Sequence, residues 1–126
     1  MVSTSDVQSM HIPPDTAHVA SIRAFVGAIG RHSGCSDETI EDLRFAVTEA
    51  CGQALEQDAA PDGIVLRTSV DGERLTVEIE PTGSFERAGL DGKVVGRWAL
   101  IQALFPDAAL EDQGGSAVLR LAAQIG

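Results

Sequence analysis

The chain has 126 residues and a formal net charge of −10 at pH 7. This length is typical of one domain that buries a sizeable core, so we expect residues 1–126 to form a single domain. The negative charge argues against nucleic acid and against an anionic membrane as partners. It favours a partner with a basic surface, although an ordinary acidic bacterial-type surface stays an alternative.

The start of the chain predicts no targeting signal. Residues 1–6 lack the basic start and the apolar core of a secretory signal, and no apolar run approaches the roughly 18 residues that span a bilayer. The two cysteines, Cys35 and Cys51, are too few for a disulfide framework. We therefore expect a cytoplasmic protein.

Three elements are expected in the first half of the chain. Weak alternation predicts a short strand over residues 7–12, which stops at two prolines. Apolar residues at helical spacing predict a helix that begins at Asp15 or Thr16 and ends at Gly30 or at the Ser33-Gly34 pair. Ser36, followed by two acidic residues, predicts the start of a second helix.

The second half predicts a hairpin, a helix and a second pair of strands. Residues 64–70 and 75–80 alternate around an Asp71-Gly72 turn, whose central positions would need positive φ. The apolar residues that mark the third helix are Val94, Trp98, Ile101 and Leu104 or Phe105. The last strands are expected near 108–111 and 117–122. This order predicts an α+β fold, a two-layer α/β sandwich whose mostly antiparallel sheet is covered on one face by three helices.

The second helix carries the most informative pair of side chains. Glu49 and Gln53 are four residues apart, so a carboxylate and a carboxamide point from the same side of one helix. Such a pair, followed by an alternating hairpin and a Gly-containing turn, is typical of an ATP-binding half-site.

With Glu49-Ala50-Cys51 in this position, the chain resembles the anti-sigma-factor serine kinases of the GHKL, or histidine-kinase-like, ATPase superfamily, which have a Bergerat-type fold. The resemblance runs from Val7 to about Leu121 and includes residues 100–104 and 115–118. It implies a protein that phosphorylates a serine on a small antagonist protein, holds a sigma factor away from RNA polymerase and switches partners with nucleotide state. A homodimer is compatible with the resemblance.

The resemblance also implies roles for single residues. Glu49 would match the family's glutamate that acts on the attacking water or hydroxyl, and Gln53 would fall where the family has the asparagine that coordinates Mg²⁺. Gly115 and Ser116 would match its Gly-Thr-Thr segment. The nucleotide-binding residues expected on this basis are Glu49, Gln53, Gly83, Gly96, Arg97, Gly115 and Ser116.

Several positions depart from the family pattern. Gln53 is one methylene longer than asparagine, and Mg²⁺ demands near-ideal octahedral geometry. Pro81 stands where the family has its adenine-reading aspartate, and the adjacent Glu80 should face the other side of the sheet unless a bulge re-aims it. Residues 94–99 replace a Gly-x-Gly-Leu run whose backbone approaches phosphate.

Plainer interpretations stay open for each residue. Glu49 is also explained as a solvated helix charge, Gln53 as a polar residue on a helix face, and Arg97 as a surface arginine rather than a phosphate clamp. Trp98 would fill the core, in the space of adenine, or anchor an interface. The three histidines have no metal-ligand spacing, so no metal site is expected except Gln53 if Mg-ATP binds.

Three functional hypotheses follow. The leading one is an anti-sigma-factor-like regulator that sequesters a sigma factor by partner switching with an antagonist, with weak or lost kinase activity and no cofactor. The alternative is an active ATP-dependent protein serine/threonine kinase that uses Mg-ATP to phosphorylate the antagonist. The third is a small-molecule sensor whose old ATP pocket accepts another ligand.

Overall fold

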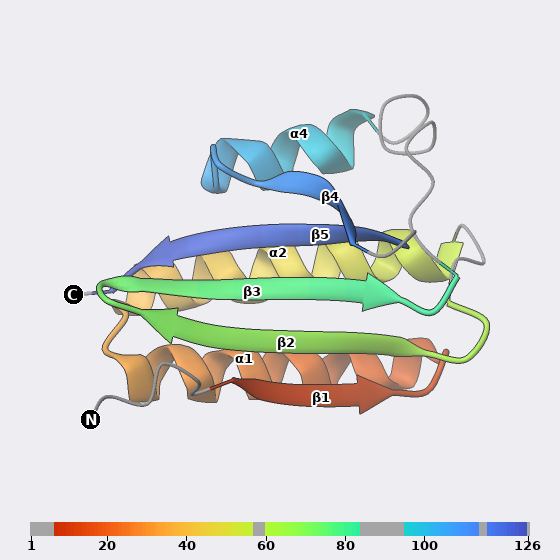
Figure 1. Ribbon diagram of the computed structural model, residues 1–126, viewed down its shortest axis with the longest axis horizontal. Helices are drawn as coiled ribbons and strands as arrows, with labels where there is room; N and C mark the ends of the chain where they lie inside the picture. Colours follow the sequence, from red (N-terminus) through yellow and green to blue (C-terminus); the bar gives the residue numbers. More distant parts are fainter. Residues whose placement is uncertain (1–6, 57–59, 84–94, 114–115, 126) are drawn as a thin grey trace.

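The computed structural model describes residues 7–56, 60–83, 95–113 and 116–125. Its strands form one sheet in the order β1-β2-β3-β5-β4, and each neighbouring pair is antiparallel (Figure 1). The strands are β1 (Gln8–Ile12), β2 (Ile64–Asp71), β3 (Arg74–Pro81), β4 (Ala109–Gln113) and β5 (Ser116–Gln124). The helices are η1 (Thr16–His18), α1 (Val19–Ser33), α2 (Asp37–Glu56) and α4 (Val95–Leu104).

Two layers result from this arrangement. In Figure 1 the helices α1 and α2 run along one face of the sheet, and α4 lies beyond the β5–β4 edge, in contact with α2. Alternate residues of the central hairpin, such as Leu75, Val77 and Ile79, are fully buried against the helices. This arrangement confirms the predicted α+β sandwich with an antiparallel sheet and helices on one face.

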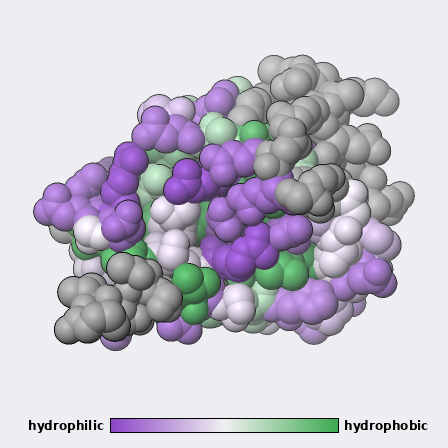
Figure 2. Space-filling model, in the orientation of Figure 1, coloured by the Kyte–Doolittle hydropathy of each residue, from purple (hydrophilic) through white to green (hydrophobic). Residues whose placement is uncertain are grey.

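The outward face of the sheet is polar. Residues between the buried positions of β3, such as Thr76, Glu78 and Glu80, point to this side and are partly exposed. Figure 2, viewed from this face, shows hydrophilic residues gathered over its middle. The alternation of β3 therefore separates a core face from a solvated face, as an antiparallel sheet allows.

The connections agree with expectation around α1 and differ from it in the central hairpin. Asp15 accepts a hydrogen bond from the Ala17 backbone N–H at 2.9 Å and caps the short η1 turn, after which α1 continues past Gly30 to Ser33. In the central hairpin Asp71 pairs with Arg74, so the turn residues are Gly72 and Glu73 rather than Asp71 and Gly72. Gly72 supplies the positive φ of 63° that this turn uses.

Glycines at two other turns have a clear structural reason. Gly34 ends α1 with φ 95°, and the N–H groups of Gly34 and Cys35 bond to carbonyls of the last helical turn at 3.2 and 2.9 Å. This is a Schellman motif. Gly63 has φ 110°, and a Cβ there would lie 2.1 Å from the carbonyl oxygen of Ile12, so it permits the close approach of β1.

No helix in the described ranges is long and apolar enough to cross a bilayer.

Candidate nucleotide site

Helix α2 positions the two candidate side chains. Its start is fixed by Ser36, whose Oγ accepts a hydrogen bond from the Thr39 N–H at 3.1 Å, and by the acidic residues of its first turn. One side of the helix is sealed in the core. Its buried residues there are Ile40, Leu43, Ala46, Val47, Ala50, Cys51 and Ala54, each no more than 2% exposed.

Gln53 belongs to this buried side. Its side chain is 1% exposed, and neither Oε1 nor Nε2 has a hydrogen-bond partner in the part of the chain that the structure describes. The helix face that carries this polar residue is therefore buried rather than solvated. A buried carboxamide without partners destabilises a fold by about 1–3 kcal/mol, which makes this side chain the most unusual polar group of α2.

Glu49 lies one turn earlier on α2 and is partly buried. It is engaged with neighbouring groups and is not a free charge. The structure thus brings Glu49 and Gln53 to adjacent turns of one helix, as their spacing predicts, although it buries the amide more deeply than the carboxylate.

The end of β3 carries Pro81, which is buried and pairs with Ile64. The next residues close the strand end against the preceding loop. The Thr82 N–H bonds to the Gly63 carbonyl at 3.1 Å, and the Thr82 hydroxyl accepts from the Asp62 N–H at 2.9 Å. Gly83 follows in an exposed turn. Pro81 has neither a backbone N–H nor a polar side chain, so it offers no side-chain acceptor at this position.

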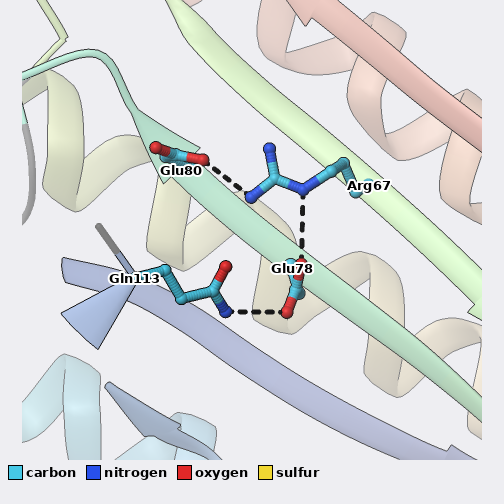
Figure 3. Close-up of polar contacts among 4 residues, drawn as sticks. All are labelled: Arg67, Glu78, Glu80 and Gln113. Carbon is cyan, nitrogen blue, oxygen red and sulfur yellow. Dashed lines mark hydrogen bonds and ion pairs between the residues drawn. The ribbon is translucent and has the colours of Figure 1, made fainter. Parts of the chain in front are cut away.

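Glu80 lies on the opposite face of the sheet, held in a polar network that spans three strands (Figure 3). Its carboxylate accepts from Arg67 at 2.7 Å, and Arg67 also donates to Glu78 at 3.3 Å. Gln113 donates to the other oxygen of Glu78 at 2.9 Å. The β2–β3 register runs without a break from Asp71–Arg74 to Ile64–Pro81, so no bulge re-aims Glu80.

Arg67 is the cation of this network. Burial tends to lower the pKa of its guanidinium, but the hydrogen bonds and negative charges of Glu80 and Glu78 outweigh that effect and raise the pKa. The guanidinium stays charged at any ordinary pH, and it therefore keeps Glu80 on the outward face of the sheet.

The remaining predicted residues lie in the segments that frame α2. Gly96 and Arg97 fall in the first turn of α4, and Ser116 begins β5. The side chains of Arg97, Trp98 and Ser116 lie outside the described part of the chain, as do Gly115 and residues 84–94. Their roles stay predictions.

Comparison with known proteins identifies a family that is consistent with this fold. A family model described as "Histidine kinase-like ATPase domain" matches residues 12–121. The chain belongs to this family. The serine-protein kinase RsbW of Bacillus pumilus is 32% identical to it over 92 residues, which are 68% of this chain. The chain spans 57% of the length of that relative.

Membership of the histidine kinase-like ATPase family implies Mg-ATP as the cofactor of an active protein. The described residues provide some of the groups that would bind Mg-ATP. The amide oxygen of Gln53 and the carboxylate of Glu49 are the hard oxygen groups that Mg²⁺ prefers. The unsatisfied amide is a group that a ligand would satisfy. At the end of β3, the side chain of Pro81 supplies no hydrogen-bond acceptor for the adenine base of ATP. In the described ranges no three His, Cys, Asp or Glu side chains come close enough to hold a metal ion by themselves.

The two thiols are not part of the candidate site formed by Glu49 and Gln53. Both cysteines are free. Burial raises the pKa of Cys51 to about 12 and raises that of the less buried Cys35 to a smaller degree. A neutral, buried thiol such as Cys51 packs as a small apolar group and is unreactive.

Sequence reasoning missed the burial of Gln53. The helical pattern carried no clear signal, because Ala50, Cys51 and Ala54 lie to one side of Gln53 around the helix and Glu49 and Glu56 lie to the other.

Proposed function

We propose that this chain is an anti-sigma-factor-like regulator that sequesters a sigma factor by stoichiometric binding and exchanges it for an antagonist protein, with weak or lost kinase activity. The end of β3 carries this proposal. Pro81 stands at the position of the family's adenine-reading aspartate, and the neighbouring Glu80 is committed to Arg67 on the outward face. Loss of a buried acceptor weakens binding by about 1–3 kcal/mol, which is roughly tenfold to a hundredfold in affinity.

The state of Gln53 supports the same proposal. A magnesium ligand must present its oxygen at about 2.0–2.1 Å from the ion in octahedral geometry, and Gln53 carries one methylene more than the family's asparagine. Its amide is sealed at 1% exposure among apolar residues of the core. The partners themselves, a sigma factor and its antagonist, come from the resemblance to the anti-sigma-factor serine kinases.

Isothermal titration of the purified chain tests the mechanism. We expect the chain to bind the sigma factor encoded nearest to it without added nucleotide, to bind Mg-ATP weakly, and to leave the antagonist unphosphorylated. Tight Mg-ATP binding together with phosphate transfer to an antagonist serine would contradict the second half of the proposal. Absence of binding to sigma factor and antagonist alike would contradict the first half.

A pair of substitutions tests the reasoning about Pro81. Pro81→Asp places an acceptor on the helix side of the sheet, and Pro81→Ala removes the ring without adding one. Affinity for Mg-ATP should rise for the Asp variant relative to the Ala variant by about tenfold or more. Equal affinities would show that this position does not control nucleotide binding.

One observation favours a second candidate function, an active ATP-dependent protein serine kinase. The buried Oε1 atom of Gln53 has no hydrogen-bond partner among the described residues, and coordination of a ligand would satisfy it. In this candidate Glu49 acts as the base, Gln53 faces Mg²⁺ and Arg97 serves the phosphates. Glu49→Ala should then abolish transfer to the antagonist without loss of folding, whereas Glu73→Ala, an exposed acid in the β2–β3 turn, should leave transfer unchanged.

A further inference from the structure

A second surface lies at the other end of α2, away from the candidate nucleotide residues. The first half of α2 and the last half of α4 border a hollow of about 460 Å³. Its lining residues are Glu41, Asp42, Phe45, Leu100, Ala103 and Leu104. Asp42 is eleven residues from Gln53 on the same helix, which is about 16 Å along its axis.

Large apolar side chains are open to solvent in this hollow. Phe45 is 41% exposed, Leu100 is 50% exposed and Leu104 is 36% exposed. Among the described residues the other large apolar side chain with such exposure is Val7. Three exposed apolar side chains gathered in one concave place, rather than scattered, indicate a surface that another molecule covers.

A second hollow of about 260 Å³ lies beside the first, and the two share Asp42 and Leu104. Its floor includes Phe105 and Pro106, which follow directly after α4. The two hollows therefore lie side by side along α2 and the end of α4, and we call them together the α2/α4 groove.

The charges around the groove are unevenly balanced. Glu41 pairs with Arg44 at 3.2 Å, and Asp107 pairs with Arg74 at 3.1 Å. Asp42, which lies between the hollows, has no ion-pair or hydrogen-bond partner within the described ranges. The first hollow thus has an apolar floor, and Asp42, which borders both hollows, is a carboxylate without a compensating charge in the described ranges.

We propose that the α2/α4 groove docks an amphipathic helix of a partner protein, with apolar residues three and four apart over Phe45, Leu100 and Leu104 and a Lys or Arg against Asp42. An apolar groove bordered by two helices is the surface that amphipathic helices recognise. The carboxylate and the net charge of −10 select a basic helix and accelerate its encounter. A second copy of this acidic chain would bring the Asp42 carboxylates together, which disfavours self-association here.

The test uses the full chain, labelled with ¹⁵N, and a designed helical peptide as the probe. The peptide has about 18 residues, or five turns, with Leu on one face and Lys beside it, and a matched peptide carries Glu in place of every Lys. We expect the basic peptide to shift the backbone amide signals of residues 41–45 and 100–104, and the acidic peptide to shift none of them.

Variants separate the apolar contribution from the charge. Leu100→Ser should weaken binding of the basic peptide by about tenfold, and Asp42→Asn by several-fold, whereas Val7→Ser should leave the affinity unchanged. Circular dichroism confirms that each variant is folded. Because Leu100 and Asp42 are exposed or partly exposed, neither change should disturb the core.

Several outcomes would overturn the proposal. The first is that the basic peptide does not bind at about 1 mM, a concentration that corresponds to a binding free energy of about 4 kcal/mol. The second is that the signal shifts are confined to residues outside the groove. The third is that the acidic peptide binds equally well. Sedimentation that shows a dimer of the chain broken by Leu100→Ser would instead assign the groove to a second copy. This inference does not depend on the proposed binding of a sigma factor.

Discussion

Replacement of Gln53 by methionine tests the most unusual feature of α2. Methionine has nearly the shape of glutamine but no amide, so Gln53→Met keeps the volume of the side chain and removes two unsatisfied polar atoms from the core. Each buried polar group of this kind costs about 1–3 kcal/mol. We therefore expect the free energy of unfolding to rise by about 1–3 kcal/mol, which is opposite in sign to most core substitutions.

Thermal and urea unfolding of the ligand-free chain measure this change. At this chain length each kcal/mol moves Tm by about 3–5 °C, so the expected increase lies well above experimental error. Leu55→Met, two residues further along α2 and partly buried, is the control for the introduction of a methionine and should change stability by less than about 1.5 kcal/mol. An isosteric charge, Gln53→Glu, should destabilise the chain strongly because nothing compensates it.

A decrease in stability for Gln53→Met would refute the reasoning. It would mean that the amide is satisfied in solution, by a bound water or by a group beyond the described residues, and that its hydrogen bonds stabilise the fold. The same titration with Mg-ATP adds information on function, because loss of nucleotide-dependent stabilisation only in the variant would assign Gln53 to the ligand.

Other predictions concern the turns, the thiols and the outward network. Gly34→Ala should lower the free energy of unfolding by about 1 kcal/mol because Gly34 has a φ of 95°. Gly63→Ala should lower it by about 3 kcal/mol or more, because the added Cβ would also overlap the Ile12 carbonyl. Equal losses in urea unfolding would be inconsistent with this geometry. In native protein at pH 8 a thiol reagent should modify Cys35 slowly and Cys51 not at all, and denaturant should expose both. Burial raises the pKa of Cys51 to about 12, so its contribution to stability is complete below its ordinary pKa of 9.0 and declines as pH rises towards 12. The pH dependence of unfolding in that window should therefore become weaker in Cys51→Ala, and the contribution of Cys35 should remain. Arg67→Gln should lower stability by about 1 kcal/mol, since its ion pairs are partly exposed, and a change above about 3 kcal/mol would contradict this estimate.

The strands and helices followed from local rules, which is why they were predictable. Ser36 before two acids, alternation over residues 75–80 and the Gly34 end of α1 each act within a few residues, and the structure confirms all three. The exact turn residues of the hairpin were not predicted, because Asp-Gly pairs favour more than one register. The pairing of Asp71 with Arg74 is set by the packing of both strands against the helices.

The candidate site was only partly predictable. Spacing on one helix sufficed to bring Glu49 and Gln53 to adjacent turns, because both belong to a single element. The burial of Gln53 and the α2/α4 groove depend on how α2 meets other elements, and helical periodicity does not carry that information. Leu104 shows the limit clearly, since the sequence offered Leu104 or Phe105 as the last apolar position of the helix, and the structure buries Phe105 and leaves Leu104 36% exposed.

The position of Glu80 shows how strand register affects recognition. Side chains alternate between faces, so the Glu80 carboxylate, one residue before Pro81, lies on the outward face, and its pairing with Arg67 at 2.7 Å holds it there. The unbroken pairing from Asp71 to Ile64 leaves no extra residue that would turn Glu80 inward. A loop can adjust to a ligand by small movements, but a strand cannot exchange its faces without breaking a run of ladder hydrogen bonds. Recovery of an acceptor on the helix side therefore requires a substitution at Pro81, and a rearrangement of the neighbouring loop does not replace it.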